Sequence, residues 1–301
     1  MKILSESEVQ YRRKRAIFTS VSVSLLLTIL KVSVGVFTMS LSLFSSALDS
    51  LGDFFISLSN IFVLKKSEAS PTKNFQYGFG KIEGISSLFQ GIFIMAIGGW
   101  IVVKGILSLF NGYEVQNTQN IVLVMIFSTI TVFFLSRFLQ KEAAATKSLV
   151  LEADCAHYKS DYLSNVSIVL GSAIIYLFHG FYWIDSFLAM GVAGLIVKDG
   201  FSIAKKAIEE LLDREIEPET KKIITSILKK YIHEKKITGI HCLKTRRSGM
   251  KIFLELHLVF SEDILLKTAH DVGDEIEAEM KQKIHSLHAT FHLDPLDDGP
   301  H

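Results

Sequence analysis

The sequence predicts an α-helical membrane protein, with six transmembrane helices followed by a small cytoplasmic α+β domain. Composition favours a membrane class, because 49% of the 301 residues are hydrophobic and the mean hydropathy is +0.35, which few soluble proteins of this size reach. Charged residues are sparse before about Lys205 and dense after it. We therefore expect a membrane domain over residues 1–208 and a soluble domain over residues 209–301.

The membrane domain contains six apolar segments, each matching the roughly 20 residues that a helix needs to cross the hydrocarbon core. They are Ala16–Phe37, Leu41–Leu64, Ile85–Phe110, Ile121–Leu139, Leu149–Phe178 and Ile184–Ala204. The fifth is interrupted by polar residues, so hydropathy alone would miss it. Lys31 interrupts the first, and the sequence assigns it no role.

The distribution of basic residues predicts the orientation of the spans. Lys and Arg gather in the loops on one side, beginning with the run Arg12–Arg15, and are absent near Met39, Asn111–Asn117 and His179–Tyr182. By the positive-inside rule, both chain termini face the cytoplasm. The basic run precedes the first apolar segment without a small-residue cleavage site, so we expect the first span to be retained.

The residue pattern after Lys206 is typical of a small α+β domain. Helical apolar spacing and strand-forming runs alternate there, with a hairpin connection at Arg247–Met250. The order αββαβ favours a ferredoxin-like arrangement with the helices on one face of a sheet. The expected elements are the helix Glu217–Ile232, the strands Gly239–Arg247 and Lys251–Phe260, the helix Ile264–Ile284 and the strand His288–Leu293.

Charge and cysteine content argue against a nucleic-acid-binding protein and against a disulfide-stabilised one. The net charge is +1, from 32 basic and 31 acidic residues, and this balance argues against nucleic acid as the main partner. The two cysteines, Cys155 and Cys242, fall in different predicted domains and form no CxxC motif. A disulfide framework is therefore excluded, which fits a soluble domain in a reducing compartment.

Two pairs of ionisable residues lie inside the apolar segments. Asp49 and Asp53 belong to SALDSLGD in the second segment, and His157 and Asp161 belong to LEADCAHYKSDYLSN in the fifth. Residues at i and i+4 share a helix face, and ionisable groups in a membrane span are costly enough to indicate function. The alternative is that each pair only makes interhelical hydrogen bonds or lines a water-filled crevice.

These four side chains suit a divalent transition metal. With both termini inside, the two spans run antiparallel, and Asp49 matches Asp161 in depth while Asp53 matches His157. Three carboxylates and one imidazole suit Zn²⁺, and Fe²⁺, Co²⁺, Cd²⁺ and Mn²⁺ remain open. Cys155 points elsewhere on the helix, as a packed cysteine would.

The motifs SALDSLGD, YGFGKIEG, ADCAHYKSDYLSN, LLDRE, HCLKTRRSG and HLDP resemble those of the cation diffusion facilitators over nearly the whole chain. The resemblance implies a homodimer that exports divalent metal from the cytoplasm in exchange for protons, of the zinc and iron type. It also implies that the metal is carried by Asp49, Asp53, His157 and Asp161. Relatives that transport zinc often have a second site in the loop after the second span, but Phe75 and Phe79 occupy the histidine positions here. We therefore expect no metal site in this loop.

The resemblance extends to the soluble domain. It assigns a cytoplasmic metal site to His241, His257, His270, His292 and Asp294. Any one of these histidines alone could instead be an ordinary surface or core residue. Lys81 and Asp213 match a pair that, in similar bacterial proteins, joins the membrane and cytoplasmic parts of two protomers. The alternative for this pair is two interfacial charges that pair with lipid or solvent.

The first functional hypothesis is thus a proton-coupled exporter of divalent metal in the bacterial inner membrane, with no catalytic residues. Metal ligands must be deprotonated, so returning protons weaken the hold on the ion. A membrane metalloenzyme is disfavoured, because no open ligand position or separate general base is evident. A metal-regulated sensor or assembly protein of the same fold is the third hypothesis.

Overall fold

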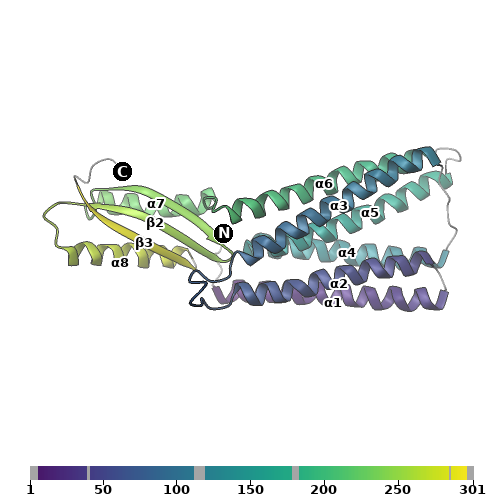
Figure 1. The fold of residues 1–301 in the computed structure, drawn as a ribbon, viewed down its shortest axis with the longest axis horizontal. Helices are drawn as coiled ribbons and strands as arrows, with labels where there is room; N and C mark the ends of the chain where they lie inside the picture. The colour runs from purple at the N-terminus through teal and green to yellow at the C-terminus, as the bar shows by residue number, and fades with distance from the viewer. Residues whose placement is uncertain (1–5, 39–40, 112–118, 178–182, 285, 297–301) are drawn as a thin grey trace. The chain divides into compact units, whose positions relative to one another are not determined.

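The computed structural model describes residues 6–38, 41–111, 119–177, 183–284 and 286–296. Within these ranges the chain forms eight helices and three strands (Figure 1). The chain divides into two compact units, Gln10–Ile208 and, together with the first nine residues, Glu209–His301.

The first unit is built from long helices. At a rise of 1.5 Å per residue, even α2, with 27 residues, is about 40 Å long, which exceeds the roughly 30 Å hydrocarbon core. Among the described residues, two stretches, Ser7–Val34 and Ile82–Val103, are both long and apolar enough to cross a membrane. The six helices are α1 (Glu6–Thr38), α2 (Leu41–Ser67), α3 (Ile82–Asn111), α4 (Gln119–Thr146), α5 (Leu149–Leu177) and α6 (Trp183–Leu211).

Helix α1 is longer than the apolar segment that predicted it. It begins at Glu6 rather than near Ala16, because the charged residues before Ala16 have acidic partners on neighbouring helices. Arg13 is only 1% exposed and pairs with Glu83 of α3, and Arg12 lies 3.5 Å from Glu142 of α4. Hydropathy ends a segment at its first charges, whereas ion pairs let the helix continue through them.

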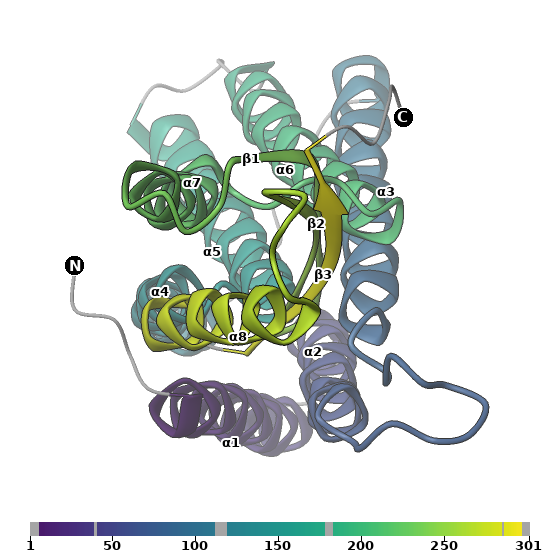
Figure 2. The ribbon, with the colours of Figure 1, turned by 90° about the vertical axis from the view of Figure 1, so that its left-hand side faces the viewer.

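Helix α5 lies between two clusters of buried side chains. On one side Leu151 and Tyr158 of α5 pack in a cluster with α1, α2 and α4, and on the other Ala153 and Ala156 pack in a cluster with α3 and α6. Figure 2 shows α5 between α4 and the α3–α6 pair. Asp154 and His157 of α5 are therefore held inside the bundle, with exposures of 0% and 2%.

The second unit is an α+β domain with the element order expected from the sequence. The β1–β2 pair is antiparallel, the β2–β3 pair is parallel, and β2 is central. Leu254, Leu256 and Leu258 of β2 are buried in one cluster with side chains of both helices, which therefore cover one face of the sheet (Figure 2). Its elements are α7 (Pro218–His233), β1 (Gly239–Ser248), β2 (Lys251–Phe260), α8 (Leu266–Lys283) and β3 (Leu287–Pro295).

Because side chains alternate along a strand, the remaining positions of β2 face away from the helices. His257 is one of them, flanked by the buried Leu256 and Leu258. The parallel pairing sets His257 opposite His292 of β3, and the antiparallel pairing sets it opposite His241 of β1. The register thus places one histidine from each strand in a single row.

Candidate metal centres

Three of the predicted membrane ligands lie together between α2 and α5. Nε2 of His157 is 2.9 Å from Oδ1 of Asp53 and 3.8 Å from Oδ2 of Asp161, and the ligand atoms of all three lie within 4.8 Å of one another. The His157 side chain is 3% exposed, whereas those of Asp53 and Asp161 are 22% and 27% exposed. The fourth predicted ligand, Asp49, lies one turn earlier on α2, and its side chain is outside the described residues.

The local geometry follows from helix periodicity. His157 and Asp161 are four residues apart on α5, so their side chains share one face. Ala153 and Ala156 are buried against α3 and α6, and the Phe93 ring of α3 lies 6.2 Å from the His157 ring. His157 is thereby confined to the interior, where its Nε2 faces two carboxylates.

This arrangement suits a cation or a proton. Each carboxylate is an oxygen donor, and Nε2 of His157 either donates a proton to Asp53 or offers its lone pair to a metal. The cluster combines an imidazole nitrogen with carboxylate oxygens, and such a mixed set of ligand atoms suits a borderline ion such as Zn²⁺. The same atom can therefore hold either a proton or a metal ion, but not both at once.

A third carboxylate, that of Asp154, lies one helical turn from His157 and was not singled out from the sequence. It is fully buried and accepts hydrogen bonds from Oγ of Ser20 in α1 at 2.7 Å and from Nδ2 of Asn60 in α2 at 3.2 Å. The hydroxyl of Tyr158 joins the network through Ser57 at 2.8 Å. Its spacing of three residues from His157 was the available signal, since that spacing puts both on neighbouring parts of one face.

Lys31, which the sequence left without a role, belongs to the same interior. Its ammonium donates a hydrogen bond to Oγ of Ser50 at 2.7 Å, in the turn of α2 between Asp49 and Asp53. Cys155 lies elsewhere on α5, with Sγ 3.3 Å from the backbone oxygen of Ser136, in keeping with a packed helix cysteine.

The loop after α2 contains an aromatic contact at Phe75 and Phe79, the two positions where the resemblance would have placed histidine. The rings of Phe75 and Phe79 are 4.8 Å apart, and the ammonium of Lys66 lies 3.9 Å from the Phe79 ring centre. Of the proposed salt-bridge residues, Asp213 lies 3.4 Å from Arg246 within its own unit. Its pairing with Lys81 across protomers stays a prediction.

The second unit gathers three histidines around one aspartate. Oδ2 of Asp294 accepts hydrogen bonds from Nε2 of His241 at 2.9 Å and from Nδ1 of His257 at 2.7 Å, and Nδ1 of His292 contacts Oδ1. Burial alone would raise the pKa of the Asp294 carboxyl, but the hydrogen bonds from His257, His292 and His241 outweigh burial and hold this pKa below its usual range. The carboxylate is thus ionised near neutral pH and can offer its oxygens to a cation.

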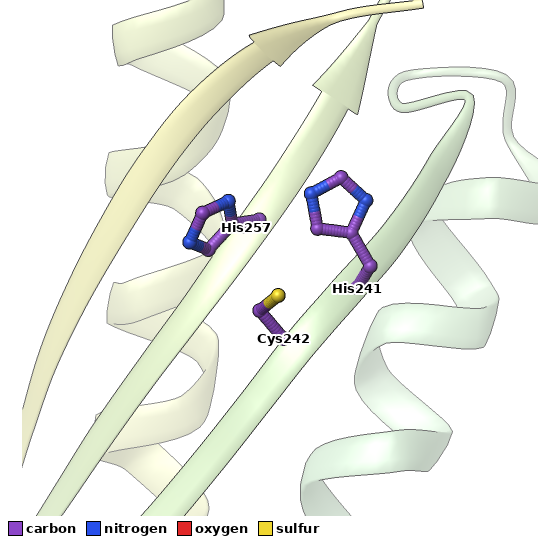
Figure 3. Close-up of side chains that lie close together, drawn as sticks. All are labelled: His241, Cys242 and His257. Atoms are coloured by element: carbon purple, nitrogen blue, oxygen red, sulfur yellow. The ribbon is translucent and has the colours of Figure 1, made fainter. Parts of the chain in front are cut away.

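The described side chains contain two potential metal-binding groups in this unit. One comprises His257, His292 and Asp294. The other comprises His241, Cys242 and His257 (Figure 3), and it includes a cysteine that neither the sequence pattern nor the resemblance assigns as a ligand. His270, assigned to the site by resemblance, belongs to neither group and lies 3.8 Å from Asp274 on α8, with its side chain 70% exposed.

Comparison with known proteins covers both units. The model of the cation efflux transmembrane domain matches residues 17–212, and that of the cation efflux protein cytoplasmic domain matches residues 216–296. The chain is 29% identical to the cation-efflux pump FieF of Shewanella oneidensis over 98% of each chain. It is 28% identical to protein p34 of Rickettsia rickettsii over 96% of this chain and 94% of that one.

Among solved structures, the Zn form of CzrB shares 35% identity over 30% of this chain and 99% of that chain, with a TM-score of 0.27. The transmembrane model alone matches more than half of the chain. The protein therefore belongs to the cation efflux family of membrane transporters, the cation diffusion facilitators.

Proposed function

We propose that this protein exports a divalent metal ion from the cytoplasm in exchange for protons, with Zn²⁺ as the first candidate and Fe²⁺, Cd²⁺ and Co²⁺ as further substrates. The observation that carries the proposal is the convergence of Asp53, His157 and Asp161 on one point between α2 and α5. In the proposed site Asp49 is the fourth ligand.

The donor set supports the choice of metal. Mg²⁺ and Ca²⁺ favour all-oxygen sites with more ligands, whereas an imidazole among carboxylates favours the borderline ions. The similar protein FieF is described as a cation-efflux pump, which agrees with export of a cation.

The contact between Asp53 and His157 supports proton coupling. Nε2 of His157 is within hydrogen-bond distance of Oδ1 of Asp53, so a proton shared there occupies the lone pair that a metal needs. A metal ion entering from the cytoplasm displaces this proton, and a proton arriving from the other side displaces the metal. Exposure of the site to each side in turn makes the exchange productive.

We place the protein in the bacterial inner membrane, with six crossings over residues 1–208 and both termini in the cytoplasm. The six long helices and the basic residues near their expected cytoplasmic ends support this topology. Residues 209–301 then form a cytoplasmic domain for metal binding and dimerisation, with His241, His257, His292 and Asp294 as its ligands. His270 is kept as a ligand on the resemblance alone, since it lies outside both groups. Lipid surrounds the exposed apolar side chains of the helices.

Flux measurement in proteoliposomes tests this function. With a pH gradient imposed and a zinc-sensitive dye enclosed, the wild-type protein should move Zn²⁺ in a gradient-dependent manner. Asp161→Ala should reduce the flux at least about tenfold. Losing a residue that only hydrogen-bonds to a metal ligand already has an effect of this size, and losing a direct ligand should have no smaller one. The matched control is Asp199→Asn, which removes a carboxylate of α6 that pairs with Lys159 at 2.7 Å and lies outside the metal group.

Three other results of the flux assay would each change the proposal. Zn²⁺ binding without flux in the wild-type protein would favour a sensor or assembly role. Near-normal flux in Asp161→Ala would remove this residue from the transport site. Flux that is the same with and without the pH gradient would contradict proton exchange.

A further inference from the structure

Cys242 lies beside two histidines on the open face of the sheet. Its sulfur, one ring nitrogen of His241 and one ring nitrogen of His257 lie within 4.8 Å of one another. The three side chains are gathered at one place on β1 and β2 (Figure 3). The two imidazole rings have centres 4.9 Å apart. Cys242 is a free, exposed thiol, so a metal ion can reach it from solvent.

An irregularity in β1 creates this neighbourhood. In a regular strand, the adjacent residues His241 and Cys242 would point to opposite faces. Here the pairing moves from His241 opposite His257 to Lys244 opposite Glu255, so β1 contains one extra residue. Cys242 lies in this bulge with a φ of 51°, a left-handed conformation that favours glycine. The bulge is what brings the sulfur near the nitrogens of both histidines.

The donor distances suit coordination of one ion. Zinc binds thiolate sulfur at about 2.3 Å and imidazole nitrogen at about 2.0–2.1 Å, so two ligand atoms on one tetrahedral ion lie about 3.3–3.6 Å apart. Side-chain movements of about 1 Å would bring the three atoms from their present spread to that separation. Oδ2 of Asp294 is already within hydrogen-bond distance of both imidazoles and supplies an oxygen for a fourth position.

We infer that His241, Cys242 and His257 form a nitrogen–sulfur site for a thiophilic divalent ion such as Zn²⁺ or Cd²⁺, in which the Cys242 thiolate is a direct ligand. The inference rests on the proposed cytoplasmic site, with which it shares His241 and His257, and adds a sulfur that the resemblance did not assign. A thiolate shifts the preference of the site from Mn²⁺ and other hard ions towards soft ones. His292 and the second oxygen of Asp294 remain on the other side of His257.

Cobalt is the probe that tests for sulfur coordination. Co²⁺ added to the full-length protein in detergent should give a thiolate-to-cobalt charge-transfer absorption in the near ultraviolet, and the predicted transport ligands cannot produce it because they include no sulfur. Cys242→Ser should abolish this absorption and weaken Cd²⁺ binding by the second unit at least about tenfold. Cys155→Ser, the matched control for the other cysteine, should leave both unchanged.

A measurement on unsubstituted Cys242 guards against a misfolded variant. In the Cys155→Ser protein, Zn²⁺ or Cd²⁺ should slow alkylation of the Cys242 thiol by a maleimide, whereas Mg²⁺ should not. Bound cobalt without the charge-transfer absorption, or alkylation that is unaffected by Zn²⁺, would overturn the inference and leave the proposed cytoplasmic site to histidine and aspartate. Loss of the absorption in Cys155→Ser alone would also overturn it. Failure of the flux assay with the absorption intact would overturn only the proposed transport.

Discussion

In the proposed transport site, His157 is the residue that would bind both the proton and the metal ion. Its Nε2 faces Asp53 and Asp161, and the next acidic residue on α5, Asp154, belongs to a separate network of neutral donors. Ser20, Asn60 and Tyr158 come from three helices, so Asp154 connects α1, α2 and α5 beside the proposed metal ligands. We assign Asp154 a positioning role.

Asp154 provides a residue-scale prediction. Asp154→Ala removes the Asp154 acceptor of the Asn60 amide, whereas the Ser20 hydroxyl keeps the Ser57 hydroxyl at 2.9 Å. A buried donor left without its acceptor costs about 1–3 kcal/mol. Thermal unfolding in detergent should therefore begin at a lower temperature than in the wild-type protein. Asp154→Asn, which keeps one oxygen acceptor, should recover part of the loss, and Asp199→Ala on the more exposed pair with Lys159 should change little. Equal stability of Asp154→Ala and Asp199→Ala would contradict the role.

Some site residues could be identified from the sequence and others could not, because different features of the fold bring them together. His157 and Asp161 share a face through helix periodicity alone, so their proximity was predictable from spacing. The environment of Asp154 depends on how three helices pack together, which no local sequence pattern predicts. Cys242 reaches His257 only because one extra residue shifts the register of β1, which strand alternation does not predict.

At the scale of elements, α3 and α6 pack backbone to backbone. A Cβ added to Gly91 would lie 2.8 Å from the backbone nitrogen of Ala204, and one added to Gly200 would lie 2.9 Å from the backbone oxygen of Gly91. Backbone atoms cannot move aside as a flexible side chain can. The two helices are thus held as a pair that any larger side chain would separate.

The glycine contact predicts opposite effects for two similar substitutions in α3. Gly91→Ala should destabilise the protein by about 1–3 kcal/mol through overpacking. Gly99→Ala, where an added Cβ meets nothing within 4 Å, should stabilise it by up to about 1 kcal/mol through helix propensity. Denaturant unfolding of both variants in detergent measures the change in the free energy of unfolding. A stabilised Gly91→Ala would show that α3 and α6 are not closely packed.

Ion pairs join α7 to α8 in the second unit. Lys230 of α7 donates a hydrogen bond to Glu279 of α8 at 2.8 Å, and Lys283 donates another at 3.1 Å. The hydrogen bond from Lys230 is the main cause that holds the pKa of Glu279 below its ordinary value of 4.5; burial opposes it and the Lys283 bond adds to it. The ionised carboxylate therefore stabilises the folded state.

The sign of the pH dependence follows from this lowered pKa. The stabilisation is fully present above the ordinary glutamate pKa of 4.5 and is lost as the pH falls through the lower folded value. Glu279→Gln should thus be less stable than the wild-type protein near neutral pH, and the difference should shrink in acid. Denaturant titrations of both proteins across this range would check the result, and a difference that grows in acid would reverse the assignment.

At the scale of the whole molecule, each compact unit contains its own set of potential metal ligands. Asp53, His157 and Asp161 lie in the first, and the histidine row with Asp294 lies in the second. The sequence predicted the order of helices and strands, because apolar periodicity and turn residues are local signals. It did not predict the early start of α1, where Arg13 is buried against Glu83, because that start depends on partners distant in the chain.

Two ligand sets in separate units predict separable effects of metal. Zn²⁺ at about a hundredfold excess over its dissociation constant should stabilise the second unit by about 2.7 kcal/mol relative to a chelator, and it should tighten the proposed dimer. Combined replacement of His257, His292 and Asp294 by alanine should remove both effects, while transport should fall less than in Asp161→Ala. Calorimetry and sedimentation of the full-length proteins would measure this. An equal response of wild type and triple variant to Zn²⁺ would return these histidines to an ordinary surface role.

The histidine row also affects how the protein behaves in the laboratory. Rings from neighbouring strands have centres 4.9 Å and 4.7 Å apart, and their side chains are 35%, 27% and 66% exposed. Imidazoles so spaced resemble the side chains of a polyhistidine tag, because several can bind one immobilised ion. We expect the untagged protein to be retained on a nickel resin and to leave it carrying nickel. A chelator wash should therefore precede any count of bound ions.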